Sequence, residues 1–198
     1  MLSPSPAIRE EGYRVNSPVL KNRPYLRSMK LRYLLALPLL AFTADNWQPF
    51  SFDKHVTVQL PAAPFDMTED AGVPAGAHAF AAQSGSEAYQ ITGPLPVPPV
   101  LNVQDARGRG LYYDGIVKGL VQEQGNVLLS RKPFSTVAGE GVVVTYKSPA
   151  TADSPEMTLF SRAFIVNRGT YVLTYFRTDA DTFSVARRRF FNSLKVKP

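Results

Sequence analysis

Two pairs of arginines are the residues of this sequence best suited to binding chemistry. Arg107 and Arg109 belong to the stretch ARGRGLYYD, where arginines and glycines alternate at the start of a predicted helix. Backbone N–H groups at a helix start can hold a phosphate or another anion. The stretch matches neither a dinucleotide-binding fingerprint nor a P-loop, and it follows prolines rather than a strand. We interpret it as a flexible entry into a helix, with Arg107 and Arg109 as candidate anion contacts.

Arg187 and Arg188 form the second pair, within the run Arg187–Arg189 near the end of the chain. Such a run can meet an anionic partner or a membrane surface. It also suits the last turns of a helix, where cations stabilise the unpaired carbonyl groups. We therefore interpret the run first as a solvated helix face and keep Arg187 and Arg188 as candidate anion or ligand contacts.

The rest of the sequence offers little catalytic chemistry. His55 and His78 belong to no zinc-protease motif, no serine-hydrolase motif is present, and we interpret both histidines as surface strand residues. The acidic stretch Asp66–Asp70 lacks the spacing of a calcium-binding loop. The sequence has no cysteine, which excludes disulfides, thiolate zinc sites, cysteine nucleophiles and lipoprotein-type lipid attachment. We expect no catalytic residue, no metal site and no cofactor.

The N-terminal part has the pattern of an export signal that starts at an internal methionine. Residues 29–44 combine Lys30 and Arg32 with an uncharged apolar run that ends in small residues. A secretory signal has this order of a basic region, an apolar core and a small-residue cleavage site. The run over 33–44 is shorter than the roughly 20 residues that span a membrane. We expect the mature protein to start between Ala44 and Asn46, and no membrane span in the mature form.

Residues 1–28 contain four prolines and no apolar period. This composition does not bury a core, so we interpret the segment as disordered or as an artefact of an upstream start codon. An unusually long basic region of a real signal is the alternative. Residues 1–44 hold seven Lys/Arg and two Asp/Glu, a net charge of +5 out of +6 for the chain. Residues 45–198 hold 15 basic and 14 acidic residues and carry only +1, so we expect no nucleic-acid partner.

Residues 45–198 are expected to form one α+β domain. Apolar residues recur at helical spacing over 110–124, which predicts a helix that ends before Gly125. Asp179 and Asp181 are expected to begin a closing helix. Strands are predicted over residues 54–60, 77–83, 88–92, 127–132, 142–147, 157–166 and 170–177.

Two of these segments have a special character. The strand over 170–177 is apolar on both faces, which predicts a central position in a sheet that is covered on both sides. The proline-rich residues 93–99 are predicted to form an extended loop. The order of hairpin, helix, antiparallel meander and helix predicts one mostly antiparallel sheet with helices packed on it.

Three stretches resemble small exported bacterial proteins of the PsbP-like fold. They are GNVLLSRKPFSTVAGEGVVVTYK, the hairpin LFSRAFIVNRGTYVLTYF and the closing RRFFNSLKV. The resemblance covers roughly residues 47–197 and implies an α/β/α sandwich. It implies no activity and assigns no site residue, because most of these bacterial proteins have no known activity. One departure is Gly139-Glu140-Gly141, where a Pro-Gly turn is more usual; we expect it to change only the loop.

We expect an exported domain, periplasmic or extracellular and soluble, that binds an envelope protein or a small ligand and is not an enzyme. The signal pattern, the resemblance and the missing catalytic motifs support this hypothesis. A hydrolase that uses Asp or Glu is one alternative, and it would need a cleft that gathers acids from residues 105–114 and a strand end. A cytosolic interaction domain with a basic arm is the other, and it would retain residues 1–44.

Overall fold

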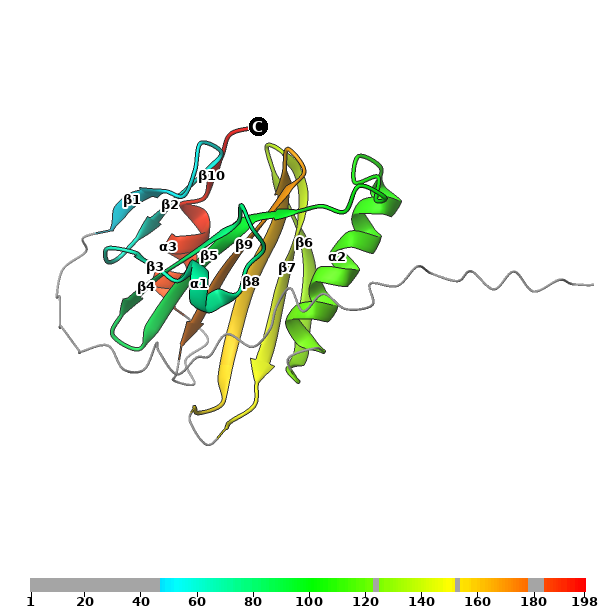
Figure 1. Cartoon of the computed structure of the whole chain (residues 1–198). Helices are drawn as coiled ribbons and strands as arrows, with labels where there is room; N and C mark the ends of the chain where they lie inside the picture. The colour runs from blue at the N-terminus through cyan, green and yellow to red at the C-terminus, as the bar shows by residue number, and fades with distance from the viewer. Residues whose placement is uncertain (1–46, 123–124, 152–153, 178–183) are drawn as a thin grey trace, which may run out of the picture.

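A seven-stranded antiparallel sheet forms the middle of the protein (Figure 1). The computed structural model describes residues 47–122, 125–151, 154–177 and 184–198. The strand order is β3-β4-β5-β9-β8-β7-β6, and every neighbouring pair is antiparallel. In chain order the strands are β3 (Phe65–Asp66), β4 (His78–Ser84), β5 (Glu87–Pro96), β6 (Val127–Thr136), β7 (Gly139–Ser148), β8 (Met157–Val166) and β9 (Gly169–Arg177).

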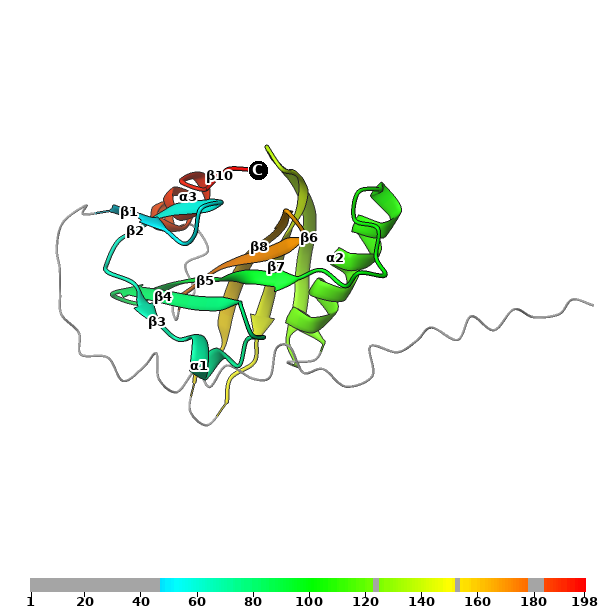
Figure 2. The ribbon, with the colours of Figure 1, turned by 45° about the horizontal axis from the view of Figure 1, so that its top comes forward.

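One layer covers each face of this sheet (Figure 2). Helix α2 (Ala106–Val121) packs on one face. The other face is covered by a small antiparallel sheet together with helix α3 (Val185–Asn192). We call this second covering, residues 47–60 and 184–198, the terminal layer. Its strands are β1 (Gln48–Ser51), β2 (Val56–Leu60) and β10 (Lys195–Val196), and a one-turn helix α1 (Thr68–Ala71) links β3 to β4.

The middle strand of the large sheet, β9, contributes to both halves of the core. Tyr171, Leu173 and Tyr175 pack toward the terminal layer. Val172 packs toward α2, and the Thr170 hydroxyl lies 2.7 Å from the hydroxyl of Tyr112 on that helix. Alternate residues of a strand point to opposite faces, so both faces of β9 are buried. The predicted central position of this strand is confirmed.

The predicted fold class is confirmed, with one mostly antiparallel sheet and helices packed on it. The hairpin LFSRAFIVNRGTYVLTYF is also confirmed, because β8 and β9 pair directly up to Val166 and Gly169, with Asn167 and Arg168 as the turn. Asn167 and Arg168 have φ of 47° and 63°, the backbone sign that a two-residue hairpin turn requires. Gly125 has φ of 68° just beyond α2, as a left-handed residue after a helix should.

The proline-rich segment was predicted as a loop, and for its first half this is wrong. β5 continues to Pro96, with Leu95 opposite Thr170 and Pro96 opposite Gly169 after a break in register. The prolines lack the N–H that a regular ladder needs, and the irregular register accommodates them. Residues 97–99 fit the prediction of irregular chain.

Helix α2 begins earlier than predicted. α2 starts at Ala106, because the Asp105 carboxylate accepts a hydrogen bond from the Gly108 N–H at 2.6 Å. The stretch interpreted as a flexible entry is therefore the first turn of the helix itself. α3 starts after Ser184, whose hydroxyl accepts from the Arg187 N–H at 3.1 Å.

Several expectations concern residues outside the described ranges. Asp179 and Asp181 lie in 178–183, and residues 1–28 and the signal-like 29–44 precede the described part, so these expectations stay predictions. None of the helices in the described part is long and apolar enough to cross a membrane.

Candidate functional site

An open pocket of about 280 Å³ lies between the first half of α2 and the adjoining strands β6 and β7. The helix contributes one wall, and the strands contribute the other. The lining residues are Ala106, Arg109, Gly110, Tyr113, Arg131, Lys132, Pro133, Glu140, Gly141 and Val142.

Two glycines beside the pocket lie where a side chain would not fit, and a third lies in open space. A Cβ at Gly108 would overlap the carbonyl oxygen of Asn102, so the helix start can lie against the preceding loop only without a side chain there. A Cβ at Gly141 would overlap the ring of Phe134 and lie 2.7 Å from the carbonyl oxygen of Ala163. At Gly110, by contrast, no atom lies within 4 Å of the place a Cβ would take. The helix surface is therefore open at the pocket.

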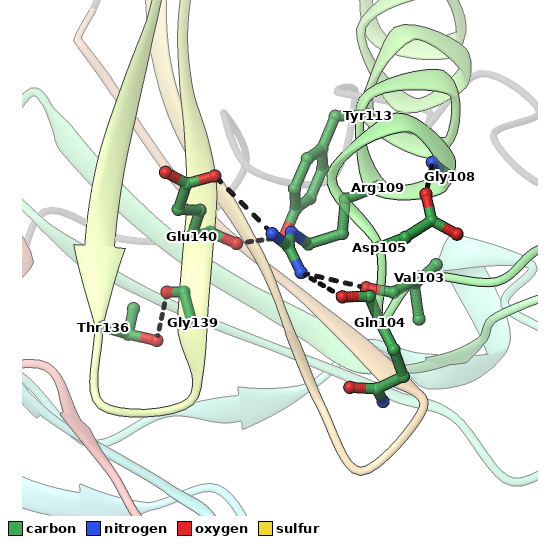
Figure 3. A network of polar contacts seen from close by, with 9 residues as sticks. All are labelled: Val103, Gln104, Asp105, Gly108, Arg109, Tyr113, Thr136, Gly139 and Glu140. Carbon is green, nitrogen blue, oxygen red and sulfur yellow. Dashed lines mark hydrogen bonds and ion pairs between the residues drawn. The ribbon is translucent and has the colours of Figure 1, made fainter.

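Arg109 is the best-fixed charged group of the pocket (Figure 3). Its Nη1 donates to the backbone carbonyls of Val103 at 3.3 Å and Gln104 at 3.0 Å. Its Nη2 lies 3.9 Å from Oε2 of Glu140, at the outer limit of an ion pair. The Nε is buried and has no hydrogen-bond partner within the described part of the chain. Two backbone carbonyls thus fix the position of the guanidinium, whereas its ion pair with Glu140 is long.

Tyr113 anchors the helix to the strand wall. Its hydroxyl donates to the backbone carbonyl of Glu140 at 2.7 Å, as Figure 3 shows. Burial raises the pKa of Tyr113 to about 12, against the opposing effect of the nearby Arg109 charge. The phenol therefore stays protonated at physiological pH and keeps its role as a donor.

The third charged group, Arg131 on β6, is paired across the pocket wall with Asp114 of α2 at 2.5 Å. Lys132 contributes to the lining but pairs with Val143, between the pairs Arg131–Val144 and Pro133–Val142. Since successive side chains alternate between faces, the Lys132 side chain points to the opposite face of the sheet. The charged side chains that face the pocket are thus Arg109, Arg131 and Glu140, and Asp114 pairs with Arg131 without lining the pocket.

The structure does not bring the four predicted arginines together. Arg109 lines the pocket, whereas Arg107 is exposed on the same helix and outside the lining. Arg187 and Arg188 lie on α3, across the large sheet (Figure 2). The Arg187 guanidinium lies 3.8 Å from the centre of the Phe160 ring, a cation–π contact.

Sequence reasoning missed the carboxylates that face these arginines. Glu140 was noted only as part of an unusual turn, and Asp114 only among the acids of residues 105–114 that the hydrolase alternative requires. Both become site residues through long-range contacts, because β6 pairs with β7 and α2 docks on them. No local signal in the sequence marks such a contact.

The histidines and the acidic stretch play no part in this pocket. His78 is exposed on β4, and His55 lies just before β2 with its Nδ1 2.8 Å from the carbonyl oxygen of Lys197. The pKa of Asp66 is lowered below its usual range, mainly by a hydrogen bond from the Thr68 side chain. Within the described ranges, no group of three His, Asp or Glu side chains could hold a metal ion.

Comparison with known proteins supports the fold. No family model and no curated protein matches this chain. Among solved structures, the chain is similar to cyanobacterial PsbP (CyanoP) from Synechocystis sp. PCC 6803. The match has a TM-score of 0.51 and 14% identity, and it covers 80% of this chain and 99% of that one. At this identity the likeness concerns the fold alone, and the chain has the PsbP-like α+β fold that its sequence resembles.

Proposed function

We propose that residues 45–198 are an exported, non-enzymatic binding domain of the cell envelope. Its pocket between α2, β6 and β7 takes a small ligand that carries a carboxylate or phosphate group. The observation that carries this proposal is the arrangement of Arg109, which two backbone carbonyls hold while its nearest carboxylate stays 3.9 Å away.

A ligand anion can take the place that Glu140 fills loosely. The Glu140 side chain is 67% exposed, and its ion pair is long, so it adds little stability. A ligand oxygen within hydrogen-bond distance of Arg109 would form the shorter, charge-assisted bond that the pair lacks. Because the guanidinium is already fixed, binding would not have to order it.

The rest of the pocket suits a small ligand with an apolar part. Pro133, Val142 and the open surface at Gly110 provide apolar contact. A volume of about 280 Å³ is near the lower end of the range of small-molecule sites. The expected ligand is therefore of metabolite size rather than a polymer.

The hydrolase alternative finds less support in the same pocket. Glu140 and Asp114 do come from a strand start and from residues 105–114, as that alternative requires. However, each lies beside an arginine, and their side chains are 67% and 56% exposed. A carboxyl that serves as a general acid is normally shielded from water. The lining residues also include no Ser, Thr or His that could act as nucleophile or base.

The test is a titration of the protein with succinate and with inorganic phosphate, followed by backbone NMR shifts of the pocket residues. We expect Arg109→Gln to weaken binding about tenfold or more, because a charge-assisted hydrogen bond is lost. Glu140→Gln should strengthen binding, because the competing carboxylate is removed. Arg107→Gln is the matched control on the same helix and should change affinity less than twofold.

Two results would overturn the proposed ligand class. One is that neither anion shifts the pocket residues of the natural protein. The other is that Arg107→Gln weakens binding as much as Arg109→Gln, which would show a general charge effect. The Glu140→Gln variant separates recognition from folding, because a purely structural role of Arg109 gives no reason for tighter binding.

A further inference from the structure

The terminal layer carries most of the net positive charge of the described residues. Its residues 47–60 and 184–198 contain six Lys/Arg and one Asp/Glu, a formal net charge of +5. The described residues between 61 and 177 contain nine Lys/Arg and eight Asp/Glu, a net charge of +1. Residues 178–183 add two aspartates next to α3 in sequence and lie outside the described part. The domain as a whole is therefore nearly neutral, although its terminal layer is strongly basic.

The lysines of this layer point away from the core. Lys195 of β10 pairs with Thr57, and the Lys197 N–H donates to the carbonyl of His55. Val196, between them, packs into the core, so strand alternation directs Lys195 and Lys197 outward. Both are exposed, as is Lys54 in the turn before β2.

The one acid of the layer is turned inward. The Asp53 carboxylate accepts hydrogen bonds from the N–H groups of His55 and Val56 at 2.7 and 2.8 Å. It also accepts one from the buried Tyr171 hydroxyl at 2.6 Å. With its oxygens occupied by the turn and by Tyr171, Asp53 makes no ion pair with the three exposed lysines.

The arginines of α3 belong to the same layer. Arg187 stacks on Phe160 at 3.8 Å, and Arg189 lies 5.0 Å from the ring of Trp47. These contacts hold the guanidinium groups near the protein surface while they keep their charge. Arg188 is exposed between them.

We propose that the terminal layer docks on a membrane surface of anionic phospholipids, with headgroup phosphates against Lys54, Lys195 and Lys197. Lysines are depleted in protein–protein interfaces, which favour arginine and aromatic residues. Anionic lipids, by contrast, attract clustered lysines without a fixed contact geometry. Charge complementarity thus favours a lipid surface over an acidic protein.

The remaining charge distribution fits this orientation. Helix α1, which contains Glu69 and Asp70, lies on the side of the large sheet opposite the terminal layer in Figure 2. Helix α2 also lies on the far face of the large sheet in Figure 2, and residues of this helix line the pocket. A docked protein would keep the acids of α1 away from the lipid and its pocket open. The docking proposal does not depend on what the pocket binds.

The test is cosedimentation of the natural protein, as recovered from its own cells, with lipid vesicles. One set contains phosphatidylglycerol and phosphatidylcholine, and the other contains phosphatidylcholine alone. The double variant Lys195→Gln/Lys197→Gln should lose about 25-fold in affinity for the anionic vesicles, about fivefold for each lysine. The control Arg107→Gln/Lys118→Gln removes two exposed cations from α2 and should change affinity less than twofold.

Three outcomes would overturn the proposal. The natural protein fails to bind anionic vesicles, it binds both kinds of vesicle equally, or the two double variants lose the same affinity. Retention on poly-glutamate in place of vesicles, abolished by Lys195→Gln/Lys197→Gln, would assign the layer to an acidic protein instead. Far-ultraviolet circular dichroism of each variant confirms that it is folded, and these surface lysines carry no core contact whose loss would unfold it.

Discussion

A single carboxylate, Glu87, joins two central strands to the start of α3. It accepts hydrogen bonds at 2.7 Å from the hydroxyls of Tyr89, Tyr175 and Ser184. Its side chain is 18% exposed, and Arg177 lies 3.8 Å away. Ser184 is also the residue that caps α3. The attachment of the terminal layer to the large sheet thus depends in part on one charged residue.

We predict that Glu87→Gln lowers the free energy of unfolding by about 1–3 kcal/mol. The amide that replaces one oxygen donates rather than accepts, so at least one buried hydroxyl loses its partner. The matched control is Glu156→Gln, whose side chain is 57% exposed beside Lys147 and should cost less than about 0.5 kcal/mol. Urea unfolding curves measure both, and equal losses would show that the Glu87 cluster does not hold the layers together.

Residue identity alone predicted part of the candidate site. Arg109 could be found, because an arginine among glycines at a helix start is visible in the sequence. Arg107 has the same local signal but lies outside the pocket. The difference depends on which side of α2 faces the strands. The predicted helix began four residues too late to include either arginine, so it could not show which of them faces the strands. Glu140 could not be found, because only the packing of α2 on β7 makes it a neighbour of Arg109.

Among the elements, α2 shows how one residue type has opposite effects within a single helix. Gly115 is exposed, and no atom lies within 4 Å of the position of an added Cβ. An added Cβ at Gly108 would overlap the backbone of Asn102. The first glycine only weakens the helix, whereas the second permits its close approach to the preceding loop.

We therefore predict opposite changes in stability for two alanine variants. Gly115→Ala should raise the free energy of unfolding by about 0.5–1 kcal/mol, since alanine favours the helical backbone. Gly108→Ala should lower it by about 1–3 kcal/mol, because the loop at Asn102 must shift. Thermal unfolding followed by circular dichroism measures both changes. The packing described for the helix start is contradicted if Gly108→Ala is as stable as Gly115→Ala.

Strand β6 shows why element boundaries were harder to predict than element types. The predicted strand stopped at Lys132, before Pro133, whereas β6 runs to Thr136. Proline is tolerated in a strand when its nitrogen faces away from the neighbouring strand, which is possible only at a sheet edge. β6 is the edge strand of the large sheet. The sequence gives strand type but not strand position, so the extension could not be foreseen.

For the whole molecule, the terminal layer was the part least accessible to sequence reasoning. β10 and β2 are far apart in the sequence, yet they pair at Lys195–Thr57 and Val196–Val56. A two-residue strand carries no periodic signal. The end of the closing helix at Asn192 was therefore not predicted from the sequence. The large sheet was predictable because its strands are long and mostly sequential. The concentration of positive charge became visible only when residues 47–60 and 184–198 were found in one layer.

The central claim, an exported binding domain that begins near residue 45, is tested most directly by the intact mass of the native protein from fractionated cells. The account predicts the mass of a chain whose first residue is near Asp45, in an envelope or medium fraction. The mass of a chain that starts at Met1, found in the cytosol, would contradict it. Residues 1–44 would then be a real basic arm, and a cytosolic interaction domain would replace the exported one.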